Sequence, residues 1–213
     1  MALKPITVWN FVVGPNPKKI FIILEELGIP YEKINIANPK EESFLKINPN
    51  GRLPAIKDPN NDDFILWESG AIIEYLIETY DKEGKLNLPL ANDRALLKQY
   101  LFFEVSGQGP YYGQGVWFHK LHPEDLPSVK KRYSDQTVRV MEVLDGLLKG
   151  KQYLVGDKCT YADLSFVPWD VIVTGQFSEV TAGYDVENKY PHWYAWHKRL
   201  VERPSVKKVY ADA

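Results

Sequence analysis

The order of local patterns in the first 80 residues is the feature that most constrains the fold of this chain. Short apolar or alternating runs, typical of strands, alternate there with segments that have helical periodicity and helix stop signals. The expected order is strand, helix, strand, helix, strand, strand, helix, over residues 6–9, 17–27, 31–36, 41–47, 53–57, 64–67 and 69–80. The turn sequence at residues 60–63, NNDD, predicts that the last two strands form a hairpin. These residues therefore predict an α/β domain.

The pattern changes after residue 80. Residues 81–90, DKEGKLNLPL, are polar and contain one glycine and one proline, so we expect a linker there. The rest of the chain has helical periodicity over residues 94–118, 123–148 and 191–201. Thr160 followed by Asp163 predicts a capping box at a further helix start. The expected organisation is an α/β domain over residues 1–80, a linker over 81–90 and an all-helical domain over 91–213.

Composition excludes several classes of protein. The net charge of −2 gives no basic surface for nucleic acid or an anionic membrane. No apolar run approaches the roughly 18 residues of a membrane-spanning helix, and the N-terminus lacks the apolar core of a secretory signal. With Cys159 as the single cysteine, an internal disulfide and a cysteine metal cluster are impossible. We expect a cytoplasmic protein without a metal.

Pro54 lies inside an expected strand, in the stretch NPNGRLPAI at residues 48–56. Proline has no N–H to donate to a neighbouring strand, so a central strand should exclude it. One interpretation is an edge strand with an ordinary trans proline. The other is a cis bond between Leu53 and Pro54, which would leave the Leu53 backbone free to pair with an extended peptide. The residues alone leave both interpretations open.

The same stretch, followed by WESGAIIEYL at residues 67–76, resembles the thioredoxin-like domain of glutathione transferases. The second half is similar to the fungal transferases related to the yeast nitrogen regulator and to the bacterial nu class. The segments that carry this likeness are FFEVSGQGPYYGQ, KKRYSDQTVRVMEVLDGLL and YLVGDKCTYADLSFVPW. The resemblance covers roughly residues 6 to 207. It implies a thioredoxin-like domain (βαβαββα) followed by a helical bundle, glutathione as co-substrate and a homodimer.

The resemblance also implies where glutathione binds. Leu53 and Pro54 take the place of the family's peptide clamp, and Glu68-Ser69 that of its γ-glutamyl site. Ser69 opens a helix, whose positive end attracts a carboxylate, and Glu68 offers a negative charge to the glutathione amine. The alternative for this pair is a plain helix cap. Arg52 and Lys40 are cations expected near the glycyl carboxylate, although either could simply be solvated.

The activation of the glutathione thiol is the catalytic question, because a free thiol has a pKa of about 8.5. Many transferases use Tyr, Ser or Cys after the first strand, and residues 10–18 contain none of the three. The similar subgroup has an asparagine at the position of Asn16. Its amide can donate a hydrogen bond to sulfur but cannot ionise. We expect Asn16 to stabilise the thiolate, assisted by the backbone at Gly14; the alternative is that Asn16 only caps a helix.

The nu-class relatives resemble disulfide reductases that hold two glutathiones or one glutathione disulfide. Arg132 matches the family's second anion-binding position, although an exposed helix charge is the simpler explanation. The stretch 107–115 is no phosphate loop, because no strand precedes it and it lacks the Lys-Ser/Thr end. We expect it to bend a helix. Its neighbourhood offers Tyr111, Tyr112 and Trp117 as candidate walls of a second-substrate pocket, with core packing as the alternative for each.

The expected function is therefore that of a glutathione-dependent transferase or disulfide reductase. Two alternatives use the same fold, namely a carrier of hydrophobic ligands and a regulatory module. The Asn-rich N-terminal extension of the yeast nitrogen regulator does not occur in this sequence. We therefore expect an enzyme rather than a regulator.

Overall fold

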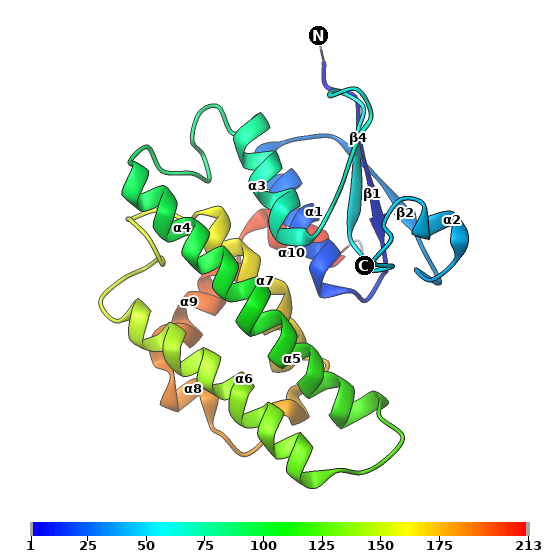
Figure 1. Ribbon diagram of the computed structural model, residues 1–213. Coiled ribbons are helices and arrows are strands. Elements are labelled where there is room, and N and C mark those ends of the chain that lie inside the picture. The colour runs from blue at the N-terminus through cyan, green and yellow to red at the C-terminus, as the bar shows by residue number, and fades with distance from the viewer. Residues whose placement is uncertain (1, 212–213) are drawn as a thin grey trace. The chain divides into compact units, whose positions relative to one another are not determined.

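The computed structural model describes residues 2–211 and divides into two compact units (Figure 1). One unit contains the chain up to Asn87 together with the segment from Pro204, and the other contains Leu88–Arg203. We expected every residue after 90 to belong to the helical domain. The last helix, α10 (Pro204–Ala211), instead packs against α1 (Pro15–Leu27). The Ser205 hydroxyl donates a hydrogen bond of 2.5 Å to the carboxylate of the buried Glu26 of α1.

A four-stranded sheet forms the centre of the first unit, with strand order β2-β1-β3-β4. Strands β1 and β2 are parallel, whereas β3 is antiparallel to both β1 and β4. The predicted hairpin is confirmed, with Ile56 opposite Leu66. The strand β1 is buried along its whole length, since every residue of it lies in the core. The strands are β1 (Ile6–Asn10), β2 (Tyr31–Asn35), β3 (Ala55–Asp58) and β4 (Phe64–Trp67).

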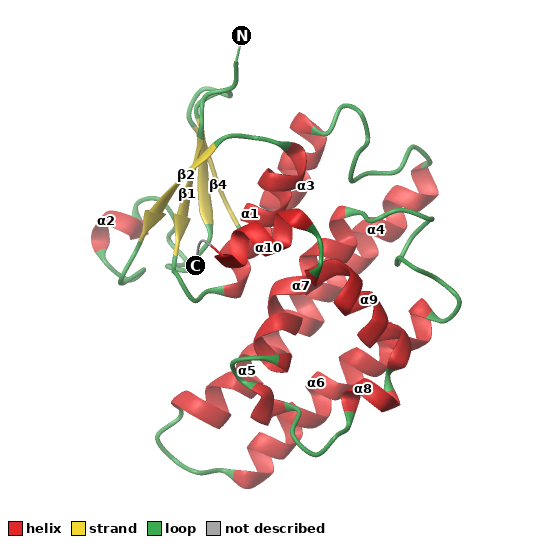
Figure 2. Ribbon diagram, turned by 180° about the vertical axis from the view of Figure 1, so that it is seen from behind, coloured by secondary structure: helices red, strands yellow, loops and turns green. Residues whose placement is uncertain are grey.

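Helices cover both faces of this sheet. Figures 1 and 2 show α1, α3 (Ser69–Tyr80) and α10 on one side of the sheet and the short α2 (Glu42–Leu45) on the other. The helix α1 begins two residues before the expected Pro17 and ends at Gly28, which has a φ of 69° in the left-handed region that glycine favours. The order of elements is the predicted βαβαββα, and the thioredoxin-like domain is confirmed.

Helices make up the second unit. The expected helix over residues 94–118 is interrupted by two wide, π-helical segments, Glu104–Gln108 and Trp117–Leu121. The stretch in which we expected a bend thus lies next to π-helical segments, which often mark functional sites in long helices. The helices are α4 (Ala91–Phe103), α5 (Gly109–Val116), α6 (Pro127–Leu148), α7 (Tyr161–Thr174), α8 (Val186–Lys189) and α9 (Pro191–Val201), with a 3-10 turn at Ser178–Val180.

The start of α7 confirms the predicted capping box. The backbone N–H and the hydroxyl of Thr160 both donate to the Asp163 carboxylate, at 2.9 and 2.7 Å. The same buried carboxylate accepts from the Leu154 N–H and from the indole N–H of Trp196, both at 2.9 Å. Through these hydrogen bonds Asp163 connects α7 to α9 and to the loop that precedes α7. Within residues 2–211, no helix is both long and apolar enough to cross a membrane.

Candidate functional site

An open groove of about 350 Å³ lies at the start of α1 in the first unit. This volume is within the range of sites that bind small ligands, roughly 300–1,000 Å³. The first residues of α1, the loops after β1 and β2 and the turn before β3 supply its lining, which consists of Phe11, Gly14, Pro15, Asn16, Pro17, Ala37, Pro39, Gly51, Arg52 and Leu53. Four of the residues predicted from the sequence therefore meet in one groove, namely Gly14, Asn16, Arg52 and Leu53.

The Leu53–Pro54 peptide bond is cis, as one of the two interpretations required. Within residues 2–211, the backbone N–H and C=O of Leu53 make no hydrogen bond. The preceding carbonyl, of Arg52, accepts a hydrogen bond of 2.7 Å from the Asn48 side chain, which fixes the turn. The Leu53 side chain packs against the buried cluster around Trp9. A rigid turn thus presents an unused peptide donor and acceptor at the groove.

Asn16 occupies the second position of α1 and is half-buried. The N-cap is Gly14, and no side chain caps this helix, so the alternative that Asn16 is the helix cap is wrong. Pro15 and Pro17 on either side have no N–H. The Gly14 N–H donates to the Phe11 carbonyl at 2.9 Å, so it is not available to assist a thiolate as we expected. The positive end of α1 favours a negative charge beside Asn16.

Glu68 and Ser69 form the junction between β4 and α3. Glu68 is the N-cap of α3 with a φ of 74°, and its side chain makes no capping hydrogen bond. A non-glycine residue in this left-handed region costs about 1–3 kcal/mol, and such strain concentrates at functional sites. The buried Ser69 hydroxyl lies 3.5 Å from the ammonium of the buried Lys19. The pair therefore presents an exposed carboxylate and a helix start with a cation behind it.

Asn50 connects two of the predicted residues, and sequence reasoning did not single it out. Its carbonyl accepts a 3.0 Å hydrogen bond from the Lys40 ammonium, and its amide lies 3.4 Å from the Glu68 carboxylate. Lys40 is thus engaged by the loop rather than merely solvated. Arg52 is exposed, and its side chain has no hydrogen bond or ion pair among residues 2–211. The neighbouring Gly51, at a φ of 59°, has space for no larger side chain, since a Cβ there would lie 2.8 Å from the Pro39 carbonyl.

The remaining predicted residues belong to the second unit. Tyr112 is fully buried, and burial followed by the charge of Asp170 raises the pKa of its phenol well above the usual value. Tyr112 is therefore part of the core and not a pocket wall. Tyr111 is half-buried, with the guanidinium of Arg139 5.7 Å from its ring centroid, and Trp117 is 46% exposed.

Arg132 lies on α6 and is exposed. Its guanidinium makes no hydrogen bond or ion pair with any other residue that the structure describes. The neighbouring lysines, Lys130 and Lys131, are each paired with an aspartate, at 2.6 and 2.9 Å. Among the described residues, Arg132 is therefore a cation without a charged partner, next to two lysines that are each paired with an aspartate.

Comparison with protein families identifies both halves of the chain. Residues 4–78 match the N-terminal domain of glutathione S-transferases, and residues 110–204 match the C-terminal domain. The chain belongs to the glutathione S-transferase family. The chain is 50% identical, over 97% of its length and 95% of the relative's, to the glutathione S-transferase-like protein gedE of Aspergillus terreus. It is 32% identical to the protein URE2 of Candida albicans, over 95% of this chain and 69% of the relative.

Solved structures of fungal transferases share the fold closely. The transferase URE2P6 of Phanerochaete chrysosporium, in complex with oxidized glutathione, has a TM-score of 0.93 and 42% identity over 98% of this chain and 96% of its own. URE2P5 of the same fungus, cocrystallized with a glutathionyl dinitrobenzene, has a TM-score of 0.91 and 39% identity over 98% and 94%. A homologue from Lodderomyces elongisporus with two glutathiones per subunit has a TM-score of 0.90 and 34% identity over 99% of both chains. The predicted glutathione transferase fold is thus confirmed.

Proposed function

We propose that this transferase binds glutathione in the groove at the start of α1. The observation that carries the proposal is the unused N–H and C=O of Leu53, which match the hydrogen-bonding needs of an extended peptide. In this arrangement the γ-glutamyl carboxylate lies at the start of α3 beside Ser69, and its amine faces Glu68. The glycyl carboxylate lies toward Arg52 and Lys40, whose charges have the sign that it requires.

Asn16 then stabilises the glutathione thiolate. Lowering a thiol pKa from about 8.5 by about two units requires about 2.7 kcal/mol of preferential stabilisation of the thiolate. A hydrogen bond to a charged group contributes roughly 1.5–3 kcal/mol. The Asn16 amide and the positive end of α1 together therefore supply the required magnitude without any group that ionises.

The reaction that we propose is reduction of a disulfide as well as conjugation. The glutathione thiolate attacks one sulfur of a small disulfide, the sulfur–sulfur bond breaks, and the released thiolate takes a proton. A second glutathione thiolate attacks the glutathione sulfur of the mixed disulfide and gives glutathione disulfide and the second thiol. Two glutathiones thus supply both electrons, and no protein cysteine takes part, in keeping with the buried position of Cys159. Related structures with oxidized glutathione and with two glutathiones per subunit support this proposal.

Arg132 is the residue that we assign to the second glutathione, because its guanidinium has no charged partner among the described residues.

The glutathione thiolate would also attack an aryl halide or a peroxide. The structure of URE2P5 with a dinitrobenzene conjugate supports the conjugation part of the proposal. We extend the proposal to a homodimer that acts in the cytoplasm, in detoxification. Exposed apolar side chains such as Phe64 and Phe102, 42% and 63% exposed, are of the kind that a subunit interface buries.

A carrier of hydrophobic ligands is the second candidate function. Phe11, Val12 and Val13 form an exposed apolar run at the edge of the groove, each at least 45% exposed. Such a run would hold an apolar ligand without any chemistry on it. A carrier would bind glutathione conjugates but show no turnover.

The test is glutathione-dependent reduction of a small model disulfide, measured beside conjugation of an aryl halide. We expect disulfide turnover to exceed conjugation, and Asn16→Ala to lose turnover while glutathione affinity is kept. Arg132→Ala should weaken binding of glutathione disulfide more than that of glutathione, with Lys149→Ala, an exposed cation directly after the end of α6, as the control. Unchanged turnover in Asn16→Ala would contradict the assignment, and binding without either reaction would favour the carrier.

A further inference from the structure

The π-helical segment between α4 and α5 carries two fully buried polar side chains, Glu104 and Gln108, in the core of the second unit. The Gly109 N–H donates to the Glu104 carbonyl, five residues back, which is the hydrogen bond of a π-turn. The Gln108 amide donates to the Asp170 carboxylate of α7 at 2.9 Å and to the Phe166 carbonyl at 3.2 Å. The Gln108 side chain therefore connects the π-turn to α7.

Asp170 is fully buried, and the other groups around it are uncharged at neutral pH. The indole N–H of Trp193 in α9 donates to its carboxylate at 3.3 Å. The buried phenol of Tyr112 in α5 lies beside it, and burial raises the pKa of this phenol well above the usual value. His197 stacks on Trp193 with centroids 5.7 Å apart, and burial lowers the pKa of its imidazole to about 4. These neighbours supply hydrogen bonds and aromatic contacts but no positive charge.

The charge that acts on Asp170 is that of Glu104, a second buried carboxyl group of the same sign. Burial first, and then this charge, outweigh the hydrogen bonds and raise the pKa of Asp170 to about 7. The titratable group on the nearby α4 is Tyr100, which acts on Asp163. Two carboxyl groups that interact in a buried site do not both ionise easily, so such a pair keeps one proton to a higher pH than either would alone.

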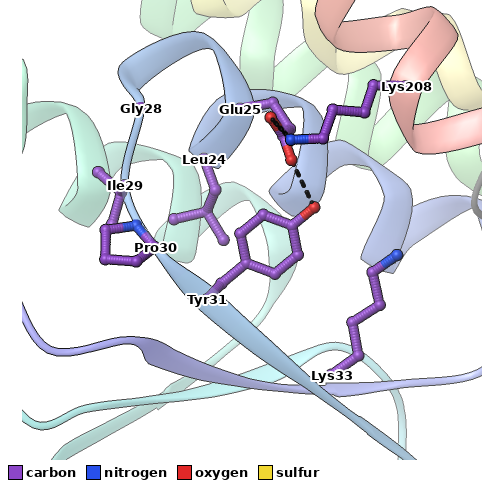
Figure 3. A pocket seen from close by; sticks show the side chains of 8 residues that line it. All are labelled: Leu24, Glu25, Gly28, Ile29, Pro30, Tyr31, Lys33 and Lys208. Carbon is purple, nitrogen blue, oxygen red and sulfur yellow. Dashed lines mark hydrogen bonds and ion pairs between the residues drawn. The ribbon is translucent and has the colours of Figure 1, made fainter.

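A carboxylate of the first unit shows the opposite arrangement (Figure 3). Lys208 and Tyr31 donate hydrogen bonds of 2.8 and 2.7 Å to Glu25. Burial by itself would raise the pKa of Glu25, but the hydrogen bonds and the charge of Lys208 hold it below its usual value. A neighbouring cation thus keeps Glu25 ionised. The charged neighbour of Asp170 is an anion, which favours the protonated form instead.

The amide oxygen of Gln108 gives independent support for a proton in this cluster. It is fully buried and has no hydrogen-bond partner among residues 2–211. A buried acceptor without a donor is destabilising. A protonated carboxyl group has one O–H donor that an ionised one lacks. Glu104 lies one turn before Gln108 and Asp170 is in contact with it, so a proton on either carboxyl group is close to this acceptor.

We propose that Glu104 and Asp170 share one proton at neutral pH, and that this proton keeps the π-turn packed against α7. At alkaline pH the proton passes to solvent and leaves two buried like charges. Their repulsion displaces the π-helical segment from α7, and the displacement reaches the start of α5. The π-turn is thereby a pH-sensitive element of the second unit. It uses no residue of the proposed glutathione groove and does not depend on the proposed function.

The test follows the proton and the segment separately in the full-length protein, between about pH 6 and 9, where ordinary carboxyl groups are already ionised. Infrared difference spectroscopy should show a carboxylic acid C=O band that disappears with a midpoint at about pH 7. In nuclear magnetic resonance spectra, the backbone amide signals of Gly107 and Gly109 should shift with the same midpoint.

Two substitutions and a control assign the proton. Glu104→Gln removes the like charge and should lower the midpoint by at least about one pH unit, a tenfold loss of proton affinity. Asp170→Asn should abolish the band and the shift in this range, because Glu104 then ionises at lower pH. Asp157→Asn, at an exposed acid of the same unit, should leave both unchanged.

The proposal is overturned if the unaltered protein has no carboxylic acid band at about pH 6, since the pair would then hold no proton. An unchanged midpoint in Glu104→Gln would overturn it too, because Asp170 would then bind its proton alone. A band that titrates while the Gly107 and Gly109 signals stay fixed would overturn the link to the π-turn. If Asp170→Asn does not fold, the unaltered protein and Glu104→Gln still decide.

Discussion

Replacing Asp163 by alanine should destabilise the helical unit more than any other substitution of an acidic residue that we consider. Its carboxylate is fully buried and accepts four hydrogen bonds, from the Thr160 N–H and hydroxyl, the Leu154 N–H and the Trp196 indole. Alanine leaves three N–H groups buried without an acceptor, at about 1–3 kcal/mol each. The loss is partly offset, because burial raises the pKa of Asp163 and so also penalises the charge that is removed.

The expected loss is therefore about 3–5 kcal/mol, the range for breaking one side of a buried polar network. That is a large share of the roughly 5–15 kcal/mol by which domains are stable. Asp163→Asn should lower the free energy of unfolding by about half as much. Its remaining oxygen still accepts from one pair of donors, either Leu154 and Trp196 or the two groups of Thr160, while its amide N–H₂ faces the other pair. The measurement is urea unfolding followed by far-UV circular dichroism. Asp157→Ala, an exposed acid of the same unit, is the control. Equal midpoints for Asp163→Ala and Asp157→Ala would refute the reasoning.

Three further substitutions test other features. Gly51→Ala should lower the free energy of unfolding by about 1–2 kcal/mol, because position 51 has a φ of 59°, and calorimetry should show weaker glutathione binding. The control Gly146→Ala, in open space within α6, should not lower the free energy of unfolding. Glu68→Gly should raise the unfolding midpoint by relieving the φ of 74° and weaken glutathione binding; a lower midpoint would show that the strain is not real. Burial raises the pKa of Asp170 to about 7, so its protonated form stabilises the fold below pH ~4, and this contribution is lost as pH rises through about 7. Asp170→Asn should remove that dependence, and identical slopes of stability against pH for variant and unaltered protein would contradict it.

Much of the fold could be predicted because its signals are local. The strand and helix order, the hairpin, and the capping box at Thr160 each depend on residues a few positions apart, and all three are confirmed. The position of α10 could not be predicted, since it depends on the bond between Ser205 and Glu26, 179 residues apart. The π-helical segments at Glu104–Gln108 and Trp117–Leu121 have no sequence signal beyond the glycines and proline between them.

The candidate site was predictable where one motif carries it. Arg52 and Leu53 lie in the groove because they belong to one turn whose residue types are distinctive, and Asn16 lies there because it is at the start of α1. Two expectations failed for reasons of three-dimensional packing. The Gly14 N–H is used by the carbonyl of Phe11, and Tyr112 is buried in the second unit, neither of which the sequence pattern indicates.

The packing of α10 has a consequence for how the chain is made. During synthesis the sheet and α1 leave the ribosome first, and the helix that covers this part of α1 is translated last. The apolar side chains of Val206 and Val209 and the Ser205 hydroxyl are then still missing from the first unit. Native packing of the first unit therefore waits for the helical unit to be translated, so a nascent chain released early would expose the side of α1 that α10 normally covers.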